Sequence, residues 1–280
     1  MHLNLPISLR LSTISQIPTM AWVGVFFFTW LIVWLPIAIP LAWKLKWRPF
    51  EPLTPAQKLP LVASLYAIVP ALLWGFATLR EQSFEQYGFA WNVDLLTSGL
   101  TGVGIAITGL LVLFTVQQWQ AWSYWQQASF TQLRAAILPS FLIGLWISVT
   151  EELVFRGFLL NQLQMLAPVW LAAIGSSLIF AVLHLLWERQ ETLPQLPGLW
   201  LLGMVLVLAR WADDGWLGLA IGLHAGWVGG LISLDSTQAI QYQAQAPLWF
   251  VGIAQKPLAG LGGISLLCLT AGLVWAIGSF

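Results

Sequence analysis

Charged residues are scarce in this sequence. Asp, Glu, Lys and Arg make up 8% of the 280 residues, whereas 59% are hydrophobic. A soluble domain carries about 25% charged residues, so the composition excludes an ordinary soluble protein and predicts an integral membrane protein. The formal net charge is zero, and no basic tail or patch suggests nucleic acid as a partner. The lipid bilayer is therefore the first partner that we expect.

Cysteine is nearly absent as well. Cys268 is the single cysteine, which excludes an internal disulfide framework and a Cys-based zinc motif; we expect an inert thiol that faces lipid or the core. Tryptophan, in contrast, occurs 19 times. Trp favours the membrane–water interface, so we expect most of these rings in interfacial belts and fewer in the lining of a substrate groove.

Long apolar runs supply the expected architecture. A transmembrane helix needs about 20 mostly apolar residues, and by this rule the sequence predicts an all-α, polytopic bundle of about eight membrane-spanning helices. The sixth span is short for a crossing, and the polar segment 117–134 suits an interfacial helix or a long loop. A polar, surface-exposed loop is predicted at 235–247. The predicted spans are 21–43, 60–79, 95–116, 137–166, 170–187, 198–211, 216–234 and 258–280.

The first span is predicted to be retained. Its apolar run is too long for the core of a signal peptide, and no cleavage site with small residues is evident. Pro36 and Pro40 are expected to kink its end.

Lys and Arg residues predict the orientation. They are more frequent after odd-numbered spans, and cytoplasmic loops carry the excess of these residues. We therefore predict that the odd loops are cytoplasmic and that both termini lie outside, in a plasma membrane or an internal membrane. The residues after odd spans are Lys44, Lys46, Arg48, Lys58, Arg134, Arg189 and Lys256, and those on the other side are Arg10, Arg80 and Arg210.

Three ionised residues interrupt the fourth span, at Glu151, Glu152 and Arg156. A charge at the centre of a membrane costs roughly 2.5–3.5 kcal/mol on insertion scales, so such residues suggest function. Glu152 and Arg156 are four residues apart, which predicts an ion pair on one helix face. Glu151 is rotated away and is expected to face a cavity without a partner, where a carboxylate can act as a general base. The alternative is that all three residues only hold helices together.

Two histidines lie in other spans. His184 follows Phe180 by one helical turn, and His224 is surrounded by small residues. With Glu151 they would bring three spans to one polar site, as helical bundles do. Two site types fit these residues: a zinc ion held by Glu151, His184 and His224, or water activated by Glu151 and one histidine while the other stabilises an oxyanion.

These residues resemble those of the type II CAAX prenyl endopeptidase family, which also contains bacteriocin-processing and bacteriocin-immunity membrane proteins. Three motifs occur in the family's order, each on its own predicted span: Glu151-Glu152-x-x-x-Arg156, Phe180-x-x-x-His184 and His224. The resemblance covers about residues 138–234. It implies an intramembrane protease core at 135–280, preceded by a three-span region at 1–134, the two forming a single membrane domain.

The resemblance also implies roles. Glu151 would be the general base, His184 would share the attacking water, and His224 would stabilise the oxyanion. The implied reaction is endoproteolysis of a membrane-associated or lipid-modified protein or peptide, and a metal-independent mechanism is favoured over zinc.

One position departs from the family pattern. Asn or Asp normally follows the third-motif histidine by four residues, whereas this sequence has Val228. The indole N–H of Trp227 is a possible substitute donor. The departure keeps a second function open, that of an inactive membrane scaffold, immunity or protein-stabilising factor of the same fold. A transporter is a third reading, but no inverted repeat supports it.

Overall fold

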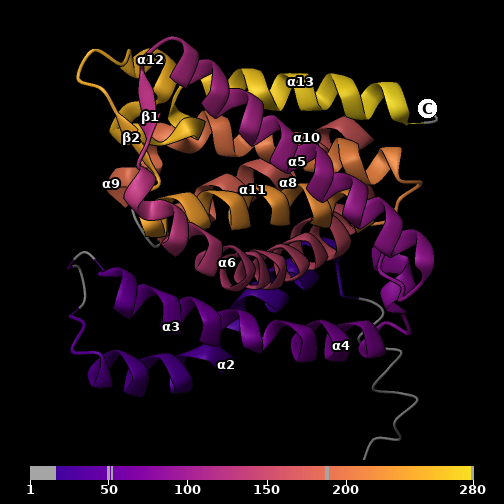
Figure 1. The fold of residues 1–280 in the computed structure, drawn as a ribbon. Helices are drawn as coiled ribbons and strands as arrows, with labels where there is room; N and C mark the ends of the chain where they lie inside the picture. The colour runs from indigo at the N-terminus through magenta and orange to yellow at the C-terminus, as the bar shows by residue number, and fades with distance from the viewer. Residues whose placement is uncertain (1–16, 49–50, 52, 187–188, 279–280) are drawn as a thin grey trace, which may run out of the picture.

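The computed structural model describes residues 17–48, 51, 53–186 and 189–278. Arg10, Trp187 and Phe280 lie outside these residues. Helices dominate the described part, and labels follow Figure 1. The elements with their bounds are α2 (Thr19–Lys44), α3 (Pro55–Ala67), α4 (Val69–Leu79), a 3-10 turn (Phe84–Tyr87), α5 (Val93–Trp119), β1 (Ser123–Trp125), a 3-10 turn (Gln127–Ser129), α6 (Phe130–Glu151), a π-helix (Glu152–Leu159), α7 (Leu160–Gln164), α8 (Val169–Leu183), a 3-10 turn (His184–Leu186), α9 (Arg189–Thr192), a 3-10 turn (Leu193–Gln195), α10 (Leu196–Ala212), α11 (Gly218–Thr237), β2 (Ile240–Tyr242), α12 (Leu248–Val251), 3-10 turns (Ile253–Gln255 and Pro257–Ala259) and α13 (Leu261–Ile277).

The prediction of an all-α, multi-pass membrane bundle is confirmed. Seven helical stretches among the described residues are long and apolar enough to cross a bilayer, and α13 is apolar but shorter, with 17 residues. The seven stretches are Thr19–Lys44, Ala56–Leu79, Val93–Trp119, Phe130–Gln164, Val169–Leu186, Arg189–Ala212 and Gly218–Thr237.

Two predicted details are wrong. The sixth span is not short: α9, a 3-10 turn and α10 join into a stretch of 24 residues from Arg189 to Ala212, because polar residues at its start do not prevent helix formation. The segment 117–134 is neither an interfacial helix nor one long loop. The helix α5 continues to Trp119, α6 begins at Phe130, and the strand β1 between them pairs antiparallel with β2, which lies in the loop predicted at 235–247.

Two prolines lie inside the first span. The helix α2 continues through Pro36 and Pro40 as far as Lys44. Exposed Trp side chains lie near helix ends, for example Trp43, Trp91 and Trp119, where an interfacial belt requires them. Cys268 on α13 is exposed, on a surface that is expected to contact lipid.

The helix α11 lies inside the bundle. Figure 1 shows α2, α3 and α4 together on one side and α13 on the opposite side, with α5, α6, α8, α10 and α11 between them. Every residue from Gly218 to Trp227 is buried, and α11 packs mainly against α5 and α6. A polar side chain on this part of α11 is therefore placed in the interior of the protein.

Glycines allow this close packing. A Cβ atom built on Gly222 of α11 would lie 2.0 Å from the carbonyl oxygen of Gly99 on α5, and one on Gly144 of α6 would lie 2.7 Å from the backbone nitrogen of Gly229. Small residues let membrane helices approach each other closely. Gly222 is two residues before His224, so the contact also positions that histidine.

We predict that Gly222→Ala lowers stability by about 1–3 kcal/mol, because the added methyl group forces α5 and α11 apart. Thermal unfolding of the full-length protein in detergent measures the change. Gly104→Ala is the matched control, since nothing lies within 4 Å of a Cβ at Gly104. Equal unfolding temperatures of the two variants would contradict the packing argument.

Candidate active site

The charged motif lies where the helix type changes. The α-helix α6 ends at Glu151, and a π-helix follows from Glu152 to Leu159, whereas the sequence argument assumed a uniform α-helix. π-helices are rare and occur often at functional sites. Side chains from other helices satisfy two of its carbonyl groups: Ser176 Oγ donates to Phe155 O at 2.9 Å, and Arg210 Nη1 donates to Arg156 O.

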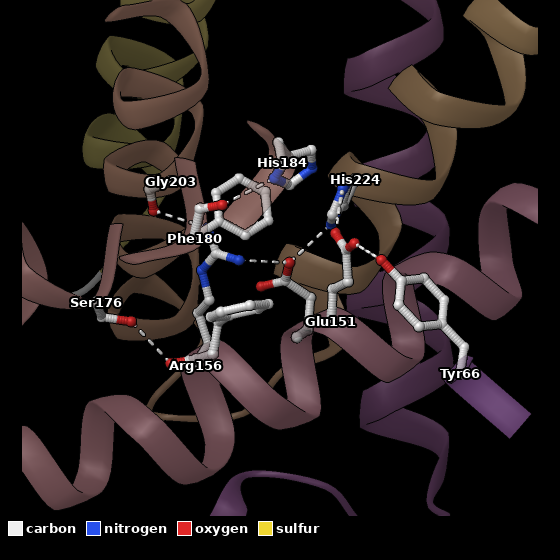
Figure 2. Close-up of polar contacts among 10 residues, drawn as sticks. Tyr66, Glu151, Arg156, Ser176, Phe180, His184, Gly203 and His224 are labelled. Carbon is white, nitrogen blue, oxygen red and sulfur yellow. Dashed lines mark hydrogen bonds and ion pairs between the residues drawn. The ribbon is translucent and has the colours of Figure 1, made fainter. Parts of the chain in front are cut away.

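Arg156 and Glu152 form a fully buried ion pair, as their spacing predicts. Arg156 Nη1 lies 3.0 Å from Glu152 Oε1, and both side chains are 0% exposed. Arg156 Nη2 donates to Gly203 O at 3.2 Å, and the guanidinium carbon lies 4.4 Å from the ring centre of Phe180. Figure 2 shows the Arg156 guanidinium next to the Phe180 ring, with a dashed line to Gly203. Arg156 therefore connects the π-helix to α8 and α10.

His224 reaches both carboxylates from α11. Its Nδ1 lies 2.7 Å from Glu152 Oε1, and its Nε2 lies 3.6 Å from Glu151 Oε2. The side chain is buried. Glu152 thus has two partners through one oxygen, Arg156 and His224, which compensates for much of the cost of burying a carboxylate.

Glu151 is not without a partner, and this corrects the sequence argument. The hydroxyl of Tyr66 on α3 donates a hydrogen bond to Glu151 Oε1, and Figure 2 shows the two side chains pointing toward each other from separate helices. Its Oε2 is buried, has no hydrogen-bond partner among the described residues and lies 3.6 Å from His224 Nε2.

His184 begins the 3-10 turn that follows α8. Its Nδ1 lies 2.8 Å from Phe180 O, and its ring centre lies 4.6 Å from that of Phe180. The Phe180 ring contacts Arg156 on its other side. The predicted Phe180–His184 packing is therefore present, and His184 is half-buried.

A cavity of about 580 Å³ begins at this site. Glu151, His184 and Tyr66 contribute the polar groups at one end, and the remaining lining is almost entirely apolar. The side chains come from α2, the α2–α3 connection, α3, the end of α6, the π-helix, the end of α8 and the 3-10 turn that follows α8. The lining residues are Phe27, Trp30, Leu31, Trp34, Leu35, Ala38, Ile39, Ala42, Trp47, Leu53, Leu61, Leu65, Tyr66, Glu151, Phe155, Leu183, His184 and Leu186.

The other expected residues lie apart from the cavity. His224 does not line it, and neither does Trp227, which is 3% exposed and whose indole N–H has no hydrogen-bond partner among the described residues. Val228 is half-buried. The lining therefore offers no support for Trp227 as a substitute donor.

The zinc alternative finds no matching geometry. Within the described part of the chain, no group of three or more His, Cys, Asp or Glu side chains is arranged to hold a metal ion. Glu151, His184 and His224 do not form such a group. The choice of metal-independent chemistry stays a prediction.

Sequence reasoning missed two site residues. Tyr66 lies far upstream of the motifs, and a single Tyr in an apolar span carries no signal. Arg210 was counted as a loop charge, but it is buried at the end of α10, where it donates to Arg156 O, to Asn161 Oδ1 at 2.8 Å and to Gly215 O at 2.9 Å.

A comparison with protein families confirms the resemblance. Residues 133–229 match the family model described as "Type II CAAX prenyl endopeptidase Rce1-like". The match includes all three motifs and ends one residue after Val228. Over this segment the chain is similar to that family. No curated protein and no solved structure matches the chain.

We predict that Arg156→Met lowers stability by about 3–5 kcal/mol, because Glu152 then remains buried without its cation. Glu152→Gln combined with Arg156→Met should recover part of this loss, since it removes the unpaired charge and keeps an acceptor for His224. Thermal unfolding in detergent compares the variants. A double variant no more stable than the single one would contradict the role of the ion pair.

Proposed function

We propose that this protein is an intramembrane endopeptidase in which Glu151 activates the attacking water. The observation that carries the proposal is the placement of Glu151 and His184 on the wall of one cavity whose other lining is almost entirely apolar. The family match over residues 133–229 supports the same reaction class.

The buried groups divide into two sets. Glu152 is held by Arg156 and His224, both at 3.0 Å or less, so it stabilises the site. Glu151 accepts a hydrogen bond from a hydroxyl on one oxygen, and its second oxygen lies 3.6 Å from His224 Nε2 without a hydrogen bond. A general base must be within hydrogen-bond reach of the proton that it removes, and Glu151 lines the cavity in which the attacking water would lie.

His184 is the second side chain that would hydrogen-bond the attacking water. Its Nδ1 is engaged by Phe180 O, which fixes the ring and leaves Nε2 for the cavity. The apolar walls limit the access of bulk water, and a low-dielectric site strengthens the electrostatic interactions that stabilise a transition state.

The lining suggests the substrate class. From Glu151 the cavity extends past Trp30 and Trp34 of α2 to Trp47 and Leu53 in the α2–α3 connection. An apolar segment or a lipid-modified peptide can occupy this length and bring a peptide bond to Glu151. The orientation rule places the α2–α3 connection, next to Lys44 and Lys46, on the cytoplasmic side, so substrates are expected from that side.

Val228 favours a second candidate function. A side chain without a hydrogen-bond donor at this position agrees with a membrane scaffold, immunity or stabilising factor that has lost its chemistry. Such a protein would use the same cavity for binding alone, and Glu151 would then be dispensable.

We predict that Glu151→Gln lowers cleavage by at least about 10²-fold, because a general base typically contributes 10²–10⁴-fold. Peptide termini in membranes from cells that express wild type or the variant measure the effect. Glu85→Gln is the control, since this glutamate is exposed and outside the cavity. Identical termini with wild type and Glu151→Gln would reject the protease and favour the scaffold.

A further inference from the structure

Peptide hydrolysis in this cavity needs a donor for the developing oxyanion. Hydrogen-bond donors aimed at that oxygen are usually the largest single contribution to acyl-transfer catalysis. The three indole N–H groups in the lining are already engaged: those of Trp30, Trp34 and Trp47 donate to Leu65 O, Ser64 Oγ and Glu51 O, each at 3.0 Å. They are therefore not available to a substrate.

The third motif does not supply the donor either. Both ring nitrogens of His224 face carboxylates, at 2.7 Å from Glu152 and 3.6 Å from Glu151, and His224 does not line the cavity. Val228, one helical turn later on α11, has no polar group. Among the described lining side chains, the donors that point to the reaction centre are His184 and the hydroxyl of Tyr66.

We propose that Tyr66 is a catalytic residue whose hydroxyl stabilises the oxyanion of the tetrahedral intermediate, in place of the side chain absent at position 228. This role rests on the proposed protease function. Tyr66 comes from α3, outside the segment that matches the family, yet its hydroxyl contacts the carboxylate of Glu151 directly. A carbonyl carbon attacked by a water on Glu151 lies next to this hydroxyl.

The bond changes follow from this geometry. The water oxygen bonds to the scissile carbonyl carbon, one water proton moves to Glu151, and the carbonyl π electrons move to the oxygen. Protonated Glu151 is a weaker acceptor, so the Tyr66 hydroxyl turns from Glu151 Oε1 to the oxyanion. The C–N bond then breaks as the carbonyl re-forms, and Glu151 returns the proton to the leaving amine. Tyr66 keeps its own proton throughout.

Tyr66→Phe tests the proposal, because it removes the hydroxyl and keeps the ring that packs beside Trp30. In the full-length protein, with a peptide substrate taken from the termini experiment, we expect kcat to fall about 10²- to 10³-fold. KM should change little, because the interaction forms only in the transition state. Tyr124→Phe removes the same hydroxyl from an exposed tyrosine of β1 and should leave kcat unchanged.

A second variant separates oxyanion stabilisation from positioning of Glu151. Val228→Asn places an amide donor on α11 one helical turn from His224, whose ring lies 3.6 Å from Glu151. Added to Tyr66→Phe, it should restore part of kcat. If Tyr66 only positioned Glu151, a donor on a different helix would not restore kcat. A double variant whose kcat does not recover would therefore overturn the oxyanion assignment.

A binding measurement adds a readout that does not depend on turnover. A peptide aldehyde with the substrate sequence forms a tetrahedral hydrate, and its inhibition constant should rise with Tyr66→Phe in parallel with the loss of kcat. The affinity of the product peptide should stay constant. Equal losses for both ligands would indicate a general distortion of the site and overturn the proposal.

The failures of the two proposals are distinguishable. Cleavage by wild type and by Tyr66→Phe at equal kcat, with an inactive Glu151→Gln, would overturn only the role of Tyr66. Absence of cleavage by wild type would reject the protease function and the role of Tyr66 with it. The unfolding temperature of Tyr66→Phe, expected near that of wild type, shows that a lost activity is not a lost fold.

Discussion

The burial of Arg156 is the constraint on which the rest of the site depends. An unpaired cation inside an apolar bundle is expensive, so partners must come from several helices at once. Glu152, Gly203 O and the Phe180 ring meet this requirement. Because Glu152 is committed to Arg156 and His224, Glu151 is the carboxylate that remains for the cavity. The ion pair therefore determines which of two adjacent glutamates lines the cavity.

The spans and the motif residues could be predicted from the sequence because both rest on strong physical penalties. A long apolar run has few alternatives to crossing a bilayer. A charged residue within such a run needs an oppositely charged partner, either four residues away on the same helix or on another helix. The pairing of Glu152 with Arg156 follows from spacing alone. The convergence of Glu151 and His224 needed the additional assumption that three spans share one polar interior.

Other features had no local signal. Tyr66 reaches Glu151 through the packing of α3 against the core, and a hydroxyl in an apolar helix has no periodic pattern. The long sixth stretch begins at Arg189 with polar residues that hydropathy assigns to a loop. Pairing of β1 with β2 joins segments more than a hundred residues apart, and strands of three residues are too short to alternate visibly. Arg210 was counted as a loop charge because its acceptors, two backbone carbonyls and Asn161 Oδ1, leave no charge pattern in the sequence.

The π-helix has a consequence for the register of the fourth span. A π-helical turn closes its hydrogen bonds five residues back instead of four, so the segment accommodates the equivalent of one extra residue, or about 100° of rotation. That extra residue sets the angle around the helix axis between the side chains of Glu151 on α6 and Asn161 on α7. Loss of any one residue between them would convert the segment to a plain α-helix and turn one half of the span away from its partners. The length of this stretch is thus as constrained as the identity of its charges.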